Sequence, residues 1–239
     1  MYWDTLDPYH YVRLHKNLLI VGGEDHKTGQ EANPSKRFRQ LERWARKRFP
    51  IGDVKFRWSG QVMETIDGLA FIGKDPGGLE NVYIATGDSG MGMTHGTIAG
   101  ILLSDLIGGR ENAWARIYEP TRKPMRTLKD YVTENINMAA QYAKWVTAAD
   151  VNSVEEIPAG GGAVIRNGIR KVAVYRDQSA ETHERSAICP HLGCIVGWNS
   201  IEKTWDCPCH GSRFDKYGKV LNGPAATDLE PTQPARRVA

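Results

Sequence analysis

Hydrophobic and polar positions in the first half of the chain follow two periods, one typical of strands and one typical of helices. The apolar run at residues 18–21 predicts a strand that ends at Gly22-Gly23. Apolar residues then recur every three or four positions, with lysines and arginines between them. They predict a helix that starts at an Asn33 cap, with Pro34 in its first position, and runs to Phe49.

The following stretch repeats this mixture of short strands and helices. Strands are predicted at residues 54–63 and 81–85, with a turn at Ile66-Asp67-Gly68 between them. A second helix is predicted from about Thr94 to a stop at Gly108-Gly109. We therefore assign residues 1–124 to one α/β unit.

The pattern changes twice in the second half. Apolar residues from Leu128 to Val146 mark one face of a long amphipathic helix, so residues 125–150 are expected to be a helical linker. Short apolar runs separated by glycine turns follow. They predict a small all-β domain over residues 151–239, with strands at 162–166, 171–175, 196–198 and 218–221. The expected fold class is α+β, with the α/β unit first, then the connecting helix and the β domain.

Composition and charge exclude several classes of protein. The chain of 239 residues is 41% hydrophobic and 25% charged, and no apolar run approaches the roughly 20 residues of a membrane helix. We therefore expect no membrane span. The net charge of +3 is spread along the chain, so a nucleic-acid partner is not expected. The first residues lack the features of a secretory signal, and a cytoplasmic location is expected.

The cysteines point to a metal site. All four lie between residues 189 and 209, beside two histidines, in the sequences CPHLGC at 189–194 and CPCHGS at 207–212. Cysteines gathered next to histidines in a chain of this length indicate metal binding rather than a disulfide scaffold. A zinc ribbon would use two cysteines and two histidines. It would leave Cys194, Cys209, Gly193 and Gly211 unexplained.

These two motifs resemble those of the Rieske family, in its disulfide-containing branch, and the resemblance covers residues 151–239. It implies a [2Fe–2S] cluster with Cys189 and Cys207 on one iron and with His191 and His210 on the other. It also implies a Cys194–Cys209 disulfide. Imidazole ligands raise the reduction potential of such clusters to roughly −150 to +300 mV.

The same resemblance implies further residues around the cluster. The Ser212 hydroxyl is expected to donate a hydrogen bond to a bridging sulfide. Phe214 stands where higher-potential members have a tyrosine, so an intermediate potential is expected. Pro224, in the turn Gly223-Pro224-Ala225, resembles the proline loop of the family.

A glycine-rich turn between the predicted strand at 81–85 and the helix after it is a second candidate site. Its backbone amides and the positive end of the helix suit a phosphate or the carbonyl edge of a reduced flavin. A tight connection without any ligand is the alternative. His95, just after the turn, could serve as a base, but a histidine at a helix start is more often exposed to solvent.

Residues 1–124 resemble the carboxy-terminal half of FAD-dependent oxidoreductases of the D-amino-acid oxidase and glycine oxidase superfamily. The matching stretches are LERWARKRFP, WSG at 58–60, DGLAFIG at 67–73 and NVYIATGDSGMGMTHGTIAG at 81–100. A subgroup of that superfamily carries a Rieske module behind the flavin part. The resemblance implies FAD contacts from the loop residues Gly87, Asp88, Ser89, Gly90, Met91, Gly92, Met93 and Thr94.

Two departures from that superfamily matter. The chain contains no G-x-G-x-x-G fingerprint for the FAD pyrophosphate, so a longer chain or a partner subunit is expected to supply that half. Amino-acid oxidising members also place an arginine shortly after the W-x-G turn, where this chain reads Gln61-Val62-Met63. An amino-acid substrate is therefore not indicated, and no catalytic residue is assigned.

Together these features predict an oxidoreductase in which a flavin oxidises a small organic substrate and a Rieske cluster transfers single electrons. The expected partners are an electron donor or acceptor, either a protein or a flavin, and the subunit with the dinucleotide-binding half. The alternative is a non-catalytic electron carrier whose first domain binds no flavin and only docks partners.

Overall fold

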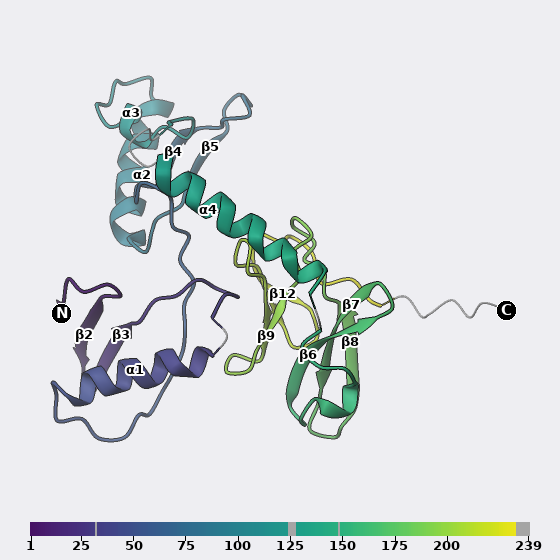
Figure 1. Ribbon diagram of the computed structural model, residues 1–239. Coiled ribbons are helices and arrows are strands. Elements are labelled where there is room, and N and C mark those ends of the chain that lie inside the picture. Colours follow the sequence, from purple (N-terminus) through teal and green to yellow (C-terminus); the bar gives the residue numbers. More distant parts are fainter. Residues whose placement is uncertain (32, 124–127, 148, 233–239) are drawn as a thin grey trace. The chain divides into compact units, whose positions relative to one another are not determined.

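The computed structural model describes residues 1–31, 33–123, 128–147 and 149–232 (Figure 1). These residues form two compact units, one of Met1–Arg57 and Asn137–Ala239 and one of Trp58–Ile136. The architecture is mixed, as predicted, with strands and helices before helix α4 (Leu128–Gln141) and an all-β domain after it. Within the described part of the chain, no helix combines the length and the apolar character needed to cross a membrane.

The first unit begins with a three-stranded antiparallel sheet. Its strands are β1 (Tyr2–Trp3), β2 (His10–His15) and β3 (Leu18–Gly23), in that spatial order. The predicted strand at 18–21 is confirmed as β3. The sequence does not reveal its partner β2, because HYVRLH mixes polar and apolar residues without strict alternation and buries only His10 and Val12.

The helix predicted after this sheet is confirmed as α1 (Pro34–Arg46), which contacts β3. It ends three residues before Phe49, where the chain turns. Asn33 occupies the N-cap position, but its side chain caps no backbone amide and accepts a hydrogen bond from the Ser35 hydroxyl instead.

The all-β domain of the first unit contains two antiparallel sheets. One has the order β6 (Gly161–Asn167), β7 (Arg170–Arg176), β8 (Thr182–Ser186). The other has the order β12 (Val220–Asn222), β11 (Arg213–Asp215), β10 (Thr204–Asp206), β9 (Gly197–Asn199). Trp205, Phe214 and Leu229 are fully buried in the core that these strands enclose.

The second unit contains a β-hairpin with helices against it. Strands β4 (Phe71–Lys74) and β5 (Tyr83–Thr86) pair antiparallel, and α2 (Gly92–Ile107) and α3 (Ala115–Tyr118) contact β4. The predicted turn is present, with Gly68 at a φ of +72° and its amide bonded to the Thr65 carbonyl. The predicted second helix is confirmed as α2, and it starts two residues earlier than expected.

The strand predicted at residues 54–63 is wrong. These residues form no strand in the structure, and Phe56 and Trp58 expose well over half of their side-chain surface. The alternation of VKFRW fits a strand, but a strand requires a neighbour for its backbone hydrogen bonds. Within the described residues no neighbouring strand pairs with this stretch.

The predicted linker helix is shorter than expected. The helix α4 (Leu128–Gln141) is followed by a 3₁₀ turn, η2 (Tyr142–Trp145), so the helical structure ends before Val146. Residues 124–127 and 148 of the expected linker lie outside the described residues. A second 3₁₀ turn, η3 (Val154–Glu156), leads into β6 and is held by a capping box between Ser153 and Glu156.

Candidate metal centre

The two metal motifs lie on two loops with the same backbone geometry. In the first loop the Gly193 amide donates to the Cys189 carbonyl over 2.9 Å, and in the second the Gly211 amide donates to the Cys207 carbonyl over 3.0 Å. Both glycines have a φ of +77°, a left-handed conformation that other residues adopt only with strain. Each loop therefore needs its glycine, which explains two residues that a simple zinc ribbon leaves without a role.

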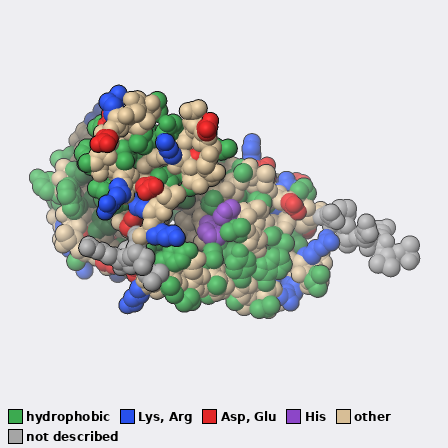
Figure 2. All heavy atoms as spheres, turned by 90° about the horizontal axis from the view of Figure 1, so that it is seen from above, with side chains coloured by type: hydrophobic (Ala, Val, Ile, Leu, Met, Phe, Trp, Pro, Cys, Tyr) green, Lys and Arg blue, Asp and Glu red, His purple; other side chains and the backbone are tan. Residues whose placement is uncertain are grey.

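The two candidate histidine ligands lie side by side. The rings of His191 and His210 have their centroids 4.8 Å apart and stand nearly perpendicular, at 89°. The Nδ1 atom of each ring is buried and has no hydrogen-bond partner. Buried polar atoms are almost always paired, so two such atoms from neighbouring rings fit a pair of metal ligands. Figure 2 shows histidine side chains at the molecular surface, next to hydrophobic ones.

The surroundings of His210 favour the protonation state that can bind a metal ion. Burial lowers the pKa of His210, and a positive charge on His191 lowers it further. Both effects favour the neutral imidazole, which is the form that binds metal ions.

The candidate thiol ligands, Cys189 and Cys207, are buried and belong to no disulfide. A hydrogen bond from the Cys207 thiol lowers the pKa of Cys189 to about 6, against the opposing effect of burial. The pKa of Cys207 is raised because its thiol donates that bond and because burial and the neighbouring thiolate oppose a second charge. A metal ion that binds the pair would displace both thiol protons to solvent, and the lowered pKa of Cys189 makes its proton the easier one to remove.

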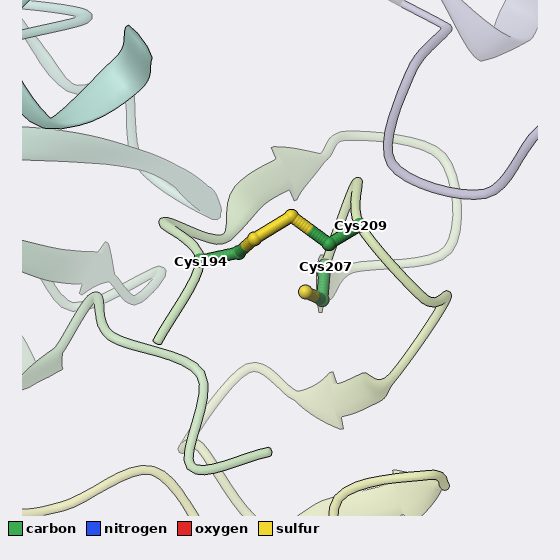
Figure 3. Close-up of side chains that lie close together, drawn as sticks. All are labelled: Cys194, Cys207 and Cys209. Atoms are coloured by element: carbon green, nitrogen blue, oxygen red, sulfur yellow. A yellow bond between two sulfur atoms is a disulfide. The ribbon is translucent and has the colours of Figure 1, made fainter. Parts of the chain in front are cut away.

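The other two cysteines, Cys194 and Cys209, are joined by a disulfide, with their Cα atoms 6.4 Å apart. Figure 3 shows this bond beside the thiol of Cys207. The three sulfur atoms lie within 4.8 Å of one another. Because two of them are already bonded, they do not form a three-thiolate metal site. The disulfide links the two loops that carry the candidate ligands.

Ser212 is fully buried at the end of the second loop. Its oxygen accepts a hydrogen bond from the Ala225 amide over 3.0 Å, and its side chain helps to lower the pKa of the Cys189 thiol. Ser212 therefore faces the candidate ligands. Phe214 is fully buried in the core that contains Cys189 and Cys207, and Pro224 is exposed in the turn before Ala225.

Sequence reasoning missed three residues outside the two loops whose side chains donate hydrogen bonds to loop carbonyls. The Gln30 side-chain amide donates to the Pro208 carbonyl over 2.7 Å. The Tyr142 hydroxyl donates to the Leu192 carbonyl over 2.6 Å, and the Trp145 indole donates to the Gly193 carbonyl over 3.0 Å. Local sequence gives no signal for contacts between residues so far apart, although Tyr142 and Trp145 stand at an unusually aromatic helix end.

The loop expected to contact FAD lies in the second unit. Gly87, Ser89 and Gly90 all have positive φ, and α2 begins at Gly92. Met91 and Met93 expose 59% and 89% of their surface. The structure thus brings a glycine turn to the amino-terminal end of a helix, with amides available to an electronegative ligand atom.

His95 is buried, which corrects the expectation that it faces solvent. Its Nδ1 is 2.8 Å from the Asp88 carbonyl, a geometry in which the ring N–H donates to that oxygen. This hydrogen bond from His95 therefore restrains the Asp88 peptide within the glycine turn. Of the surface hollows, one of about 630 Å³ is lined by Leu106 and residues 110–113 and 115, and it includes no residue of the Gly87–Thr94 loop.

Comparison with known proteins assigns the two parts of the chain to two families. Residues 1–106 match the family described as FAD dependent oxidoreductase, and residues 145–233 match the Rieske [2Fe-2S] domain. The protein YhfW of Bacillus subtilis, named as a Rieske 2Fe-2S iron-sulfur protein, is 37% identical over 217 residues. That match covers 90% of this chain and 42% of YhfW.

Two further comparisons concern the Rieske part. Iron-sulfur subunit 1 of the cytochrome b6-f complex from the Cyanophora paradoxa cyanelle is 39% identical over 97 residues, covering 38% of this chain and 41% of the subunit. The crystal structure of the plasma membrane Rieske protein PetC3 from Synechocystis PCC 6803 is 32% identical, covering 36% of this chain and 88% of that chain, with a TM-score of 0.31. The chain spans less than half the length of both curated relatives. It carries a Rieske [2Fe-2S] electron-transfer domain at residues 145–233, preceded by part of a FAD-dependent oxidoreductase domain at residues 1–106.

Proposed function

We propose that the chain is part of an oxidoreductase in which a flavin oxidises a small organic substrate and the Rieske centre passes the electrons on singly. A flavin exchanges two electrons with its substrate and can release them one at a time, whereas a [2Fe–2S] cluster exchanges one electron. The matches to both families within a single chain support this pairing. YhfW supports it too, because the 217-residue match includes both regions.

The observation that carries the proposal is the set of four groups on the two loops. Cys189 and Cys207 offer buried thiols, and His191 and His210 offer buried Nδ1 atoms without partners. We propose these four as the ligands of the cluster. Their part is to hold it, while the imidazoles, being neutral, keep its charge less negative than four thiolates would.

The proposed FAD contacts are the backbone amides of the turn from Gly87 to Thr94. The positive φ angles of this turn and the hydrogen bond from His95 keep its peptide groups in one orientation. A fixed group of amides at a helix start can stabilise the charge on the carbonyl edge of a reduced flavin. The pyrophosphate end of FAD would need the dinucleotide-binding half, which we propose as a partner subunit or a further part of the chain.

Metal analysis with two cysteine variants tests the proposed ligands. The purified chain is expected to contain two iron and two sulfide, and Cys207→Ser is expected to remove the visible absorption of the cluster. The matched control, Cys194→Ser, removes no ligand, so its cluster should assemble and be less durable. One zinc without sulfide, or equal cluster loss in both variants, would contradict the assignment.

Coupling to flavin is tested in a preparation that also contains the dinucleotide-binding half. Light-driven reduction of the flavin should be followed by the electron paramagnetic resonance signal of the reduced cluster. The Cys207→Ser variant provides the control, because its flavin should stay reduced for longer. A cluster that remains oxidised while the flavin is reduced would contradict the coupling.

A non-catalytic electron carrier is the second candidate, favoured by the lack of a G-x-G-x-x-G fingerprint in the 239 residues. In that case the first domain would only dock partners. Light absorption distinguishes the candidates, because the protein with its dinucleotide-binding half would show flavin bands only if it is the enzyme. For either candidate we propose a one-electron donor or acceptor protein as partner and the cytoplasm as location.

A further inference from the structure

The 3₁₀ turn η2 contacts the first cluster loop through two hydrogen bonds to neighbouring peptides. Tyr142 donates to the Leu192 carbonyl and Trp145 to the Gly193 carbonyl. These two peptides lie between the proposed ligand His191 and the disulfide-bonded Cys194. Both carbonyl oxygens therefore point toward η2, so the orientation of the segment between a ligand and the disulfide depends on residues outside the loop.

The turn is itself held from its other side. The Trp145 carbonyl accepts a hydrogen bond from Arg166 in β6 over 3.3 Å, and the Thr147 carbonyl accepts one from Lys171 in β7 over 2.8 Å. The sheet of β6 and β7 thus fixes η2, and η2 in turn contacts the cluster loop. A hydrogen-bond donor on a fixed segment restrains the loop that accepts the bond, whereas a donor on a mobile segment would move together with that loop.

The neighbourhood of η2 extends to the second loop. Burial lowers the pKa of Lys144, and the nearby Asp150 carboxylate and Cys207 sulfur oppose this effect. The Lys144 ammonium thus lies within electrostatic reach of a proposed ligand. The Met138 carbonyl, one turn earlier, lies 4.0 Å from the Cys209 sulfur, a contact without a proton because that sulfur is in the disulfide. The last turn of α4 and η2 together therefore contact both loops.

We propose that Tyr142 and Trp145 are positioning residues that clamp the first cluster loop, keep its carbonyl dipoles away from the cluster, and shield the Cys194–Cys209 disulfide. This inference rests on the proposed cluster. A carbonyl oxygen turned toward the cluster would disfavour the additional negative charge of the reduced form. A clamped loop also limits the opening through which a reductant could attack the buried disulfide.

The test compares Tyr142→Phe and Trp145→Phe with the unsubstituted protein, all in the cluster-containing form. One net hydrogen bond corresponds to about a fivefold change in an opening equilibrium. We therefore expect about fivefold faster amide hydrogen exchange in residues 190–194 and about fivefold faster disulfide reduction by dithiothreitol. The potential should fall by about 40 mV, which is a fivefold change for a one-electron couple.

Tyr131→Phe and Trp114→Phe serve as matched controls, since both side chains are substantially exposed and lie outside η2. They should leave all three measurements unchanged. Unchanged exchange and unchanged potential in both clamp variants would overturn the clamp, as would the same changes in the controls. Complete cluster loss in Tyr142→Phe would also overturn it, because a positioning residue leaves the ligands in place.

The two proposals fail in different ways. An unsubstituted protein without iron and sulfide would contradict the cluster itself. A cluster-containing protein whose clamp variants match the controls would contradict the clamp alone.

Discussion

Ser212 and Phe214 follow the second cluster loop and differ in what they can donate. The Ser212 side chain helps to lower the pKa of Cys189, whereas Phe214 is buried in the core that contains Cys189 and has no polar group. A hydrogen-bond donor near the sulfur atoms favours the reduced cluster, which is more negative, and so raises the reduction potential. The side chains at these two positions should therefore set part of the potential.

Replacing either residue is expected to shift the potential in a known direction. A hydrogen bond of about 1 kcal/mol corresponds to roughly 40 mV for a one-electron couple. Phe214→Tyr should raise the potential by that order, and Ser212→Ala should lower it. Protein-film voltammetry of the two variants measures both shifts. An unchanged or lower potential in Phe214→Tyr would show that residue 214 does not approach the cluster.

The candidate ligands could be predicted from the sequence because each loop is local. Within six residues, CPHLGC and CPCHGS contain a turn, its required glycine and the ligands, so spacing alone limits the geometry. Tyr142, Trp145 and Gln30 could not be found in this way. Their hydrogen bonds reach carbonyls at least 48 residues away, and any residue type offers a carbonyl.

The short strands β9, β10 and β11 are held together by one buried carboxylate. Asp206 is 3% exposed and accepts hydrogen bonds from Asn199 in β9, from Thr204 in β10 and from Arg213 in β11. It directly precedes the proposed ligand Cys207. Strands of three residues make few ladder bonds, so this side-chain network supplements them.

Asp206→Ala should destabilise the β domain by about 3 kcal/mol, because it removes the buried acceptor that Asn199, Thr204 and Arg213 share. Urea denaturation followed by circular dichroism measures the change. Glu184→Ala on β8 removes an exposed carboxylate from the same domain and should change the stability by no more than about 0.5 kcal/mol. Equal losses in the two variants would exclude a special role for the Asp206 network.

In the second unit, Arg122 joins the turn before β4 to the segment after α3. Its guanidinium donates to both carboxylate oxygens of Asp67 over 2.8 Å and to the carbonyls of Leu69 and Ala70. It also lies over the Phe71 ring, 4.1 Å from the centroid. Hydrogen bonds from Arg122 hold the pKa of Asp67 below its ordinary value of 3.8, against the opposing effect of burial.

This ion pair should make the second unit sensitive to acid. A carboxylate with a lowered pKa contributes stability above its unfolded value of about 3.8 and loses it as the pH falls through the lower folded value. The unfolding free energy should therefore decrease as the pH falls below about 4. Asp67→Asn should cost about 2 kcal/mol at pH 7 and remove this part of the pH dependence.

Urea denaturation at a series of pH values tests the expectation. Asp130→Asn on α4 changes an exposed carboxylate of the same unit and is the control. If Asp67→Asn keeps the acid sensitivity of the unsubstituted protein, the Asp67–Arg122 pair is not its source.

Elements were predicted well where apolar residues form a continuous run or face, as in β3, β7 and α2, whereas β10 and β11 were missed. β10 and β11 contain three residues each, too few to establish a period of two. The stretch 54–63 shows the opposite error. Its alternation is clear, but strand formation depends on a partner that local pattern cannot report.

For the whole molecule, the sequence predicts the order of the domains but not which segments group into one compact unit. Residues 1–124 were assigned to one unit, whereas residues 1–57 lie in a compact unit with 137–239, and residues 58–136 form another. Contacts such as that of Gln30 with Pro208 underlie this grouping. They are long-range in sequence, and no periodicity encodes them.

The isolated chain is expected to bind FAD weakly or not at all. In the second unit, the turn from Gly87 to Thr94 is expected to contact only the isoalloxazine end, whereas the pyrophosphate needs the G-x-G-x-x-G fingerprint, which the 239 residues do not contain. Half of the contacts cannot retain a ligand whose binding must also offset its loss of translational and rotational freedom. Equilibrium dialysis with FAD, read by its absorption, measures the affinity, and Gly90→Val provides a variant in which the remaining contacts are disturbed. Adding the dinucleotide-binding half should produce tight binding that Gly90→Val weakens. Stoichiometric, tightly held FAD in the isolated chain would show that its own residues form a complete site.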